Sequence, residues 1–491
     1  MQTSIKYANY AKQPNYDISQ EETILLKVLL VEFDDVKHRS PSYPLKLKSS
    51  AYTYQDFRNL LFSENLYVSP RAYSPDSALV YGSLRDYYRL MSNNKLNLQG
   101  IILNKDIDCD NIPDWITLQY QKKYYDDNRV DQFRKESKEK AKAQGLDIST
   151  NENTFLVIIY AGHTYRDYNK KTIAPHAFVE DHEYIMGERF ASGSPYREER
   201  NDPDICSVSH FSHIGIHAHE LGHLLGFDDH LGGLNNEYWC LMSKGCFNGP
   251  KNEGACPAPI NPYLRWKKDW IEFDSVVGIS RTEIYYNLQN PQIFKLKDAN
   301  SNYFFLIELR NFKAEMQFDK SSCKDYNSFV NGVTLDKGIL IWRKLNGDFS
   351  KLIYSCGYDC CYGDYHIFPG ISDMKVISPW SDSRVCKTGC YWIPNTKPSY
   401  NCGLEIISTE NDHFVIDLFQ NSPWIATPAK PKNIKSLSDT NVIITWDCNK
   451  EPDINYYKIY KRKGNFDYIF YDTSKVNYYK DIFEINDLSN N

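Results

Sequence analysis

The sequence predicts an α+β N-terminal domain, then a β-rich domain, and a partial β-sandwich at the C-terminal end. Its 491 residues exceed what one compact core usually organises, so two or three domains are expected. Strand and helix patterns alternate as far as Trp270, and strand patterns dominate after it. Hydrophobic residues make up 42% and charged residues 24%, which indicates a folded chain rather than a disordered one.

Hydrophobic spacing predicts the elements of the N-terminal domain. Strands are predicted at Ile24–Glu32, Leu96–Leu103 and Phe155–Tyr160, and helices at Ser83–Met91 and Val130–Gly145. Ser83 and Asp86 are three residues apart, as in an N-terminal capping pair, and Gly145 is suited to end a helix. Such alternation is typical of an α/β or α+β domain.

Beyond Trp270 the apolar runs are short and separated by loops rich in Asn, Asp, Gly and Cys. Strands are predicted at Ile284–Leu296, Asn302–Leu309, Gly338–Trp342 and Phe414–Leu418. Pro423–Pro431 has the composition of a linker. We therefore expect a second, β-rich unit that ends before this linker.

The region after the linker alternates apolar and polar residues at Val442–Trp446 and Tyr456–Tyr460. This pattern resembles the first part of a fibronectin type III module with Trp446 in its core, although roughly 60 residues is short for a complete sandwich. The predicted organisation is a polar N-terminal segment (1–20), the α+β domain (21–283), a β-rich, Cys-rich domain (284–422), a linker (423–431) and a partial fibronectin-like module (432–491).

The 13 cysteines are concentrated in the C-terminal half. Six of them lie in one loop-rich stretch: Cys356, Cys360, Cys361, Cys386, Cys390 and Cys402. Such density favours disulfides formed in an oxidising compartment. The alternative is a structural zinc site built from two similarly spaced pairs, but zinc ribbons usually use a shorter spacing. The odd total leaves at least one thiol outside any pairing within the chain.

Net charge and hydropathy limit the classes of partner and the cellular compartments that the sequence allows. The net charge is −6 without a long basic run, which argues against nucleic acid as a partner. No apolar stretch reaches the ~18–20 residues that span a bilayer. Met1–Gln20 has no apolar signal core, so the protein is either cytosolic or made with a leader that this sequence lacks. The cysteine usage favours the second option, an extracellular protein.

The stretch His219-Glu220-Leu221-Gly222-His223 carries the clearest chemical signal. Two histidines four residues apart lie on one face of a helix, where both imidazoles can reach a single Zn²⁺. Glu220 lies beside the first histidine, where it can take a proton from a water that the metal activates. The motif therefore predicts His219 and His223 as zinc ligands and Glu220 as general base and acid.

A third ligand is expected just after the helix. Gly226 can adopt the left-handed conformation that ends a helix and turns the chain back. The string HELGHLLGFDDH then places Asp229 at the last position of the extended motif, where His is more common. Asp229 is therefore the predicted ligand, with His230 and a distant residue such as Glu237 as alternatives.

The competing interpretation is a buried helix with surface histidines, because a bare H-E-x-x-H motif arises by chance. The apolar flank, Gly226 at its offset and the acidic ligand candidate favour zinc. His213 and His217 are expected either to be structural or to support the ligands from behind, rather than to bind the metal. Met242 is either an apolar floor below the metal or an ordinary core residue.

Several segments, in this order and spacing, resemble the immune inhibitor A family of secreted metallopeptidases. They are Leu30–Asp35, Gly82–Tyr88 with Asn94–Leu98, Ala218–Asp229, Tyr238–Met242, Tyr303–Arg310 and Gly338–Trp342. The resemblance implies a zincin-like catalytic domain that cleaves proteins outside the cell, and an Asp ligand at the position of Asp229. It also implies a leader, and calcium at sites to which no residues are assigned. The Cys-rich stretch departs from the family.

The predicted function is thus a secreted zinc-dependent endopeptidase acting on protein or peptide substrates, with C-terminal modules suited to surface or carbohydrate binding. Two alternatives stay open. One is an inactive or latent zincin-fold protein that binds surfaces, although the intact Glu220 argues against it. The other is a zinc hydrolase that acts on small amides.

Overall fold

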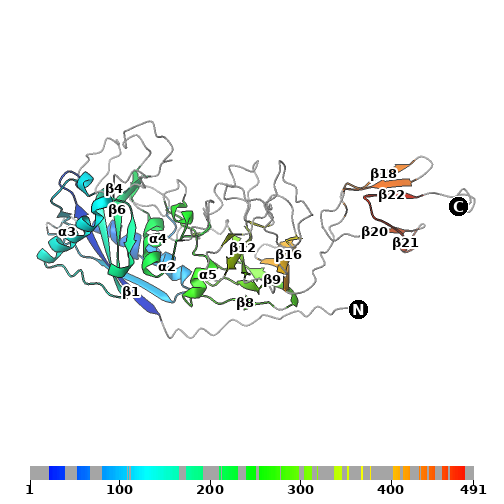
Figure 1. The fold of residues 1–491 in the computed structure, drawn as a ribbon, viewed down its shortest axis with the longest axis horizontal. Helices are drawn as coiled ribbons and strands as arrows, with labels where there is room; N and C mark the ends of the chain where they lie inside the picture. The colour runs from blue at the N-terminus through cyan, green and yellow to red at the C-terminus, as the bar shows by residue number, and fades with distance from the viewer. Residues whose placement is uncertain are drawn as a thin grey trace, which may run out of the picture.

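The computed structural model (Figure 1) shows a unit of helices and strands followed by units of strands. The residues that the structure describes are 21–38, 52–66, 80–107, 109, 112–125, 127–164, 173–191, 209–211, 213–229, 239–249, 254–276, 278–297, 303–311, 318, 337–345, 351–352, 367–368, 376–377, 402–409, 413–420, 431, 433–438, 442–447, 456–462 and 465–481. The predicted polar segment 1–20 and nearly all of the predicted linker lie outside these residues.

A seven-stranded sheet forms the centre of the N-terminal unit, in the order β2-β1-β4-β6-β5. Its strands are β1 (Glu22–Glu32), β2 (Leu96–Ile102), β4 (Thr154–Thr164), β5 (His176–Phe178) and β6 (Glu183–Ala191), with β3 (Ile116–Thr117) beside β1 and β7 (Ser209–Phe211) beside β6. The first four in spatial order run parallel, whereas β5 and β7 are antiparallel to β6. All three strands predicted in this unit are present.

Helices cover both faces of this sheet. They are α1 (Tyr54–Phe62), α2 (Leu84–Met91), α3 (Val130–Ala143), α4 (Ile214–Leu224) and α5 (Pro262–Lys267). Leu26, Val28 and Leu30 on one face of β1 share a core with α1, α2 and α4, while Leu29 and Val31 on the other face share a core with α3. Burial on both faces explains why β1 reads as a nearly continuous apolar run.

Local signals at the ends of the two predicted helices are confirmed. Ser83 Oγ accepts a hydrogen bond from the Asp86 backbone N–H at 3.0 Å, and the Ser83 backbone N–H donates to Asp86 Oδ2 at 3.0 Å. This capping box starts α2. After α3, Gly145 has a φ of +74°, the left-handed conformation that glycine adopts without strain.

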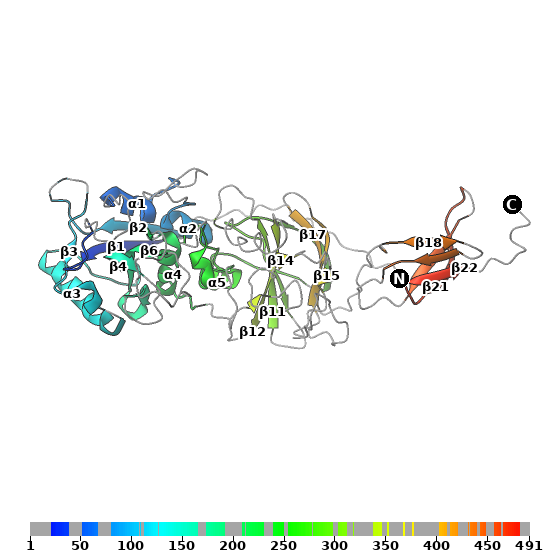
Figure 2. The same cartoon turned by 90° about the horizontal axis from the view of Figure 1, so that it is seen from above.

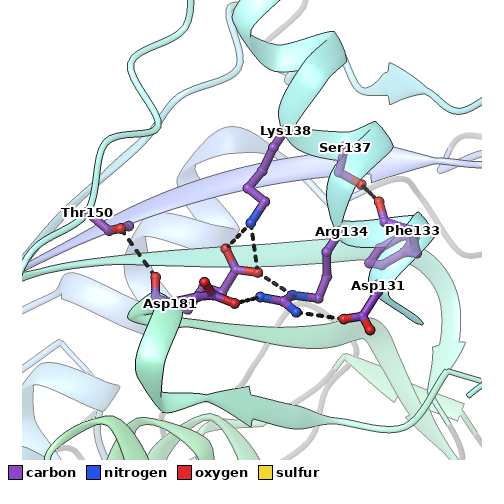
Figure 3. Close-up of polar contacts among 8 residues, drawn as sticks. Asp131, Phe133, Arg134, Ser137, Lys138, Thr150 and Asp181 are labelled. Carbon is purple, nitrogen blue, oxygen red and sulfur yellow. Dashed lines mark hydrogen bonds and ion pairs between the residues drawn. The ribbon is translucent and has the colours of Figure 1, made fainter. Parts of the chain in front are cut away.

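A network of charged side chains fixes α3 to the start of β6 (Figure 3). Arg134 Nη1 lies 2.9 Å from Asp131 Oδ1, and the same guanidinium also contacts Asp181 and Glu183. Lys138 Nζ lies 3.0 Å from Glu183 Oε2. We call these five residues the arginine network.

The β-rich unit consists of two sheets. One contains β8 (Asp274–Ser275), β10 (Phe294–Lys297), β11 (Tyr303–Asn311), β12 (Lys337–Leu345), β13 (Lys351–Leu352) and β14 (Ile367–Phe368); the other contains β9 (Gly278–Tyr285), β15 (Val376–Ile377), β16 (Cys402–Thr409) and β17 (His413–Gln420). Ile284 and Ile416 from one sheet share a buried core with Phe305 and Ile341 from the other. Figure 2 shows the two sheets from above.

The prediction of one strand over Ile284–Leu296 is wrong, because this stretch contributes to two different sheets. β9 ends at Tyr285 and β10 begins at Phe294. Between them, Asn287 Oδ1 accepts hydrogen bonds from the backbone N–H groups of Gln289 and Asn290, at 3.1 and 3.0 Å. This side-chain turn competes with strand pairing, and an apolar count does not detect it.

Arg265 of α5 joins the N-terminal unit to the β-rich unit. The residue is 2% exposed, and its guanidinium donates to the carbonyl oxygens of Met91, Leu288 and Gln289, at 2.7, 3.0 and 2.5 Å. Burial lowers the pKa of Arg265 to about 10. The largest apolar core also crosses this boundary, because it contains both Trp270 and Trp342.

The C-terminal unit contains two small sheets. β18 (Lys435–Ser438), β19 (Val442–Thr445) and β22 (Tyr478–Asp481) form one, and β20 (Tyr457–Lys461) pairs with β21 (Ile469–Ser474) in the other. The predicted strands at 442–446 and 456–460 correspond to β19 and β20. Trp446 is buried and packs edge-on against Tyr457, with ring centroids 4.9 Å apart. The assignment to a fibronectin-like fold stays a prediction.

Two further expectations concern cysteines and membrane spans. The structure gives Cys109, Cys240, Cys246 and Cys256 as thiols, so it supplies no disulfide at these positions. The cysteines from 356 to 390 lie outside the described residues, and the disulfides predicted there stay a prediction. Among the described residues, no helix has the length and apolar character to cross a membrane.

Candidate metal centre

Helix α4 presents the predicted ligands on its less buried side. Ile214, Leu221 and Leu224 are buried in the large core, while the side chains of His219 and His223 are 15% and 20% exposed. The two Nε2 atoms are 3.2 Å apart. The spacing of four residues therefore places both imidazoles together, as the sequence predicts.

The turn after α4 brings Asp229 back to the histidines. Gly226 has a φ of +85°, and the Phe227 backbone N–H donates to the Gly222 carbonyl oxygen at 2.9 Å. Asp229 Oδ1 then lies 3.2 Å from His219 Nε2 and 3.4 Å from His223 Nε2. His230 and Glu237, the alternative ligands, lie outside the described residues.

These separations fit a tetrahedral zinc ion. Ligand atoms about 2.1 Å from such an ion are about 3.4 Å apart, and the three separations here are 3.2, 3.2 and 3.4 Å. Two imidazole nitrogens and one carboxylate oxygen are also a donor set found in catalytic zinc sites, which leave a fourth position for water or substrate. Among the described residues, this is the only group of three His, Cys, Asp or Glu side chains that converges in this way.

Backbone carbonyls orient both imidazoles. His219 Nδ1 lies 3.1 Å from the Leu241 carbonyl oxygen, and His223 Nδ1 lies 2.8 Å from that of Phe227. A carbonyl oxygen only accepts, so each Nδ1 carries the proton and each Nε2 is the atom available to a metal. The sequence did not predict these two partners, because a carbonyl group carries no residue-specific signal.

Electrostatics at the centre follow from the close approach of the three groups. Hydrogen bonds from His219 and His223 hold the pKa of Asp229 well below its usual range. Burial works to lower the pKa of His223, but Asp229 raises it above its ordinary value. This attraction requires a proton on a histidine, and a bound cation would replace that proton.

Glu220 lies beside the edge strand β5. Its side chain is buried, with 7% of the residue exposed, and it accepts a hydrogen bond from the backbone of Ala177. Burial raises the pKa of the Glu220 carboxyl, although the neighbouring histidines oppose this shift. The three converging groups do not include Glu220, as the role of a general base requires.

Met242 packs directly against α4. A Cβ atom at Gly222 would lie 2.6 Å from Met242 Sδ, so the glycine allows this contact. Both interpretations of Met242, an apolar floor below the metal and an ordinary core residue, allow this contact, so its role stays a prediction. The segment that carries Met242 also supplies the Leu241 carbonyl.

His213, just before α4, and His217, within it, are both buried, and their role stays a prediction. His217 Nδ1 lies 3.0 Å from the hydroxyl of Tyr184 in β6. Burial lowers the pKa of His217 to about 3, so the ring is neutral. This pair connects α4 to the central sheet.

Comparisons with known proteins give distant likenesses only. No protein-family model matches the chain, and no curated protein matches it. Similar solved structures include two crystal forms of wild-type OgpA from Akkermansia muciniphila, with TM-scores of 0.26 and identities of 12% and 11%; they cover 71% and 72% of this chain and 96% and 94% of that protein. Catalytically inactive OgpA in complex with an O-glycopeptide substrate has a TM-score of 0.24 and 10% identity, and covers 72% of this chain and 94% of that protein. At these values the likeness identifies neither a family nor an activity, and membership of the immune inhibitor A family stays a prediction.

Proposed function

We propose that the protein is a zinc-dependent endopeptidase that hydrolyses peptide bonds of protein substrates outside the cell. The observation that carries the proposal is the convergence of His219 Nε2, His223 Nε2 and Asp229 Oδ1 at the mutual distances of tetrahedral zinc ligands. These three residues would hold the metal. Glu220 would serve as general base and then as general acid.

The protein side chains divide the work of hydrolysis. Zinc, when bound, polarises the scissile carbonyl and makes water a stronger acid. Glu220 takes the proton of the attacking water and later delivers it to the leaving amine.

The position of β5 favours a peptide over a small amide as substrate. β5 is the last strand in the order of the sheet, and its Ala177 hydrogen-bonds to Glu220. An extended peptide that adds to such an edge would bring its backbone next to the general base. Peptides of increasing length test this point: an endopeptidase cleaves long internal sequences faster, whereas an amidase shows no such preference.

The decisive experiment measures zinc content and casein cleavage together, with and without a chelator. We expect stoichiometric zinc, chelator-sensitive activity, and a Glu220→Ala variant that keeps zinc but loses about 100- to 10,000-fold in activity. Glu139→Ala is the matched control, because this exposed glutamate lies on α3, away from the centre. Zinc without cleavage in the wild type would instead support a surface-binding zincin, and absence of zinc would refute both.

A further inference from the structure

Two buried tyrosines hold the metal helix α4 from two different elements. The hydroxyl of Tyr184 in β6 lies 3.0 Å from His217 Nδ1, and the hydroxyl of Tyr88 in α2 donates to the Ala218 carbonyl oxygen at 2.5 Å. Both tyrosines are fully buried. Because they contact neighbouring residues of α4 through the same chemical group, the two contacts can be compared directly.

Tyr184 also lies opposite the strand residue that binds Glu220. It pairs with Ala177 across β5 and β6, and directly opposite residues of an antiparallel pair have their side chains on the same face of the sheet. The backbone N–H of Ala177 donates to the Glu220 carboxylate. The paired strands therefore contact α4 twice at one register position, through the side chain of Tyr184 and the backbone of Ala177.

The two contacts reach the same side of α4. His217 and Glu220 are three residues apart, so their side chains are neighbours on the helix surface, and both residues are buried. Two hydrogen bonds thus connect adjoining positions of the helix to one position of the paired strands. This closed ring of contacts fixes the distance between α4 and β5 at Glu220.

The metal ligands, in contrast, come from one short stretch of chain. His219, His223 and Asp229 all belong to α4 or to the turn that follows it. A small movement of α4 relative to β5 would carry these three groups along together. The same movement would change the position of Glu220 relative to the Ala177 N–H and to a peptide that lies along β5.

We propose that Tyr184 is a positioning residue for Glu220. Through His217 it holds α4 at the distance from β5 at which the Glu220 carboxylate meets the Ala177 N–H and faces a peptide on that strand. This role rests on the proposed function, in which Glu220 is the general base. Tyr88 has no such role, because α2 carries none of the predicted site residues and is not part of the sheet.

The first test compares Tyr184→Phe with Tyr88→Phe, a matched control that loses an equally buried hydroxyl next to the same helix. Tyr184→Phe should lower kcat about 10- to 100-fold, as expected for a small misplacement of a catalytic group. Its KM and its zinc affinity, measured against a competing chelator, should stay at the wild-type values. Tyr88→Phe should keep the wild-type kcat. Equal losses of kcat in both variants, or a loss of zinc affinity as large as that of kcat, would indicate general loosening of α4 and overturn the proposal.

Hydrogen exchange of the full chain tests the same role without catalysis. The Ala177 amide exchanges when its bond to Glu220 opens, so the β5 segment should exchange faster in Tyr184→Phe than in the wild type or in Tyr88→Phe. Unchanged exchange of β5 would overturn the positioning role even in an active enzyme. Faster exchange in a protein that shows neither zinc nor cleavage would support the role of Tyr184 in spacing α4 from β5 and refute only the proposed function.

A second variant breaks the same hydrogen bond from the helix side. His217→Leu should lower kcat as Tyr184→Phe does, and the double variant should show no further loss, because two changes that remove one bond are not additive. A multiplied loss in the double variant would show that the two residues act separately, which contradicts the closed ring of contacts. Thermal unfolding checks that each variant is folded.

Discussion

The candidate metal centre and the arginine network both gather several ionisable side chains in a small space, but they differ in what their atoms offer. In the arginine network every carboxylate faces a protein donor: Arg134 contacts Asp131, Asp181 and Glu183, and Lys138 contacts Glu183 again (Figure 3). In the metal centre two Nε2 atoms and one carboxylate oxygen face one another. The first set is complete without a ligand, whereas the second needs a cation or extra protons.

The comparison also shows that the volume of a surface groove does not by itself identify a functional site. An open groove of about 870 Å³ runs along α3 and is lined by Arg134, Lys138, Asp181, Glu183 and other charged side chains. The five residues of the arginine network that line it contact one another. The groove is best regarded as the exposed side of a structural contact.

The largest effect that separates the two regions should come from His219→Ala. Removing one of three ligands should abolish zinc binding and proteolysis, because the remaining pair cannot hold the metal tightly. Zinc content after dialysis and casein cleavage measure both effects. The comparison variant is Arg134→Met. It should retain zinc under conditions in which the variant is folded. Full zinc in His219→Ala would contradict the proposed ligand set.

A large effect on stability, by contrast, should come from Arg134→Met. Its side chain is only 8% exposed, and its removal leaves the buried carboxylate of Glu183 with Lys138 as its remaining cation. Removing one partner of a buried ion pair lowers the free energy of unfolding by about 3–5 kcal/mol. Urea unfolding measures this loss, and Lys135→Met, an exposed position on the same helix, should cost far less. Equal losses in the two variants would show that the network is not structural.

A smaller effect is expected from Gly215→Ala in the first turn of α4. A Cβ atom there would lie 2.0 Å from the Cys246 carbonyl oxygen and 2.8 Å from Gly254 Cα, and a backbone cannot easily move away. Overpacking of this kind costs about 1–3 kcal/mol. Because the displaced segment also supplies the Leu241 carbonyl to His219, zinc affinity should fall as well. Gly226→Ala, where a Cβ meets nothing within 4 Å, separates backbone strain from this clash.

The smallest effect concerns Asp181 and depends on pH. Arg134 lowers the pKa of the Asp181 carboxyl below its ordinary value of 3.8. A lowered pKa means that the stabilisation is present above pH 3.8 and disappears as the pH falls through the folded-state pKa. Asp181 is 54% exposed, so Asp181→Asn should cost only about 0–1 kcal/mol at neutral pH. Urea unfolding should show that Asp181→Asn is less stable than the wild type at neutral pH. At strongly acidic pH the two proteins should be equally stable.

Local signals in the sequence predicted much of the fold and the converging ligands. The spacing of His219 and His223 fixes a helical face, and Gly226 determines a turn that returns Asp229, so both follow from nearby residues. Contacts between distant segments left no such signal. Arg134 and Glu183 are 49 positions apart, and the close approach of Gly215 to Gly254 depends on how two segments pack. The turn at Asn287 escaped prediction for a different reason: its hydrogen bonds are local, but a pattern of apolar residues does not detect a side-chain turn.

Arg265 limits how this chain could be divided or recombined. Its guanidinium sits in the α5 helix but gives two of its hydrogen bonds to carbonyls beyond residue 283. A protease cut or a gene fusion at that point would remove two of the three acceptors of this guanidinium and leave only the carbonyl oxygen of Met91. The N-terminal unit would then be expected to collapse or aggregate rather than act alone. Exchange of modules between proteins should therefore occur after the β-rich unit, with both units inherited together.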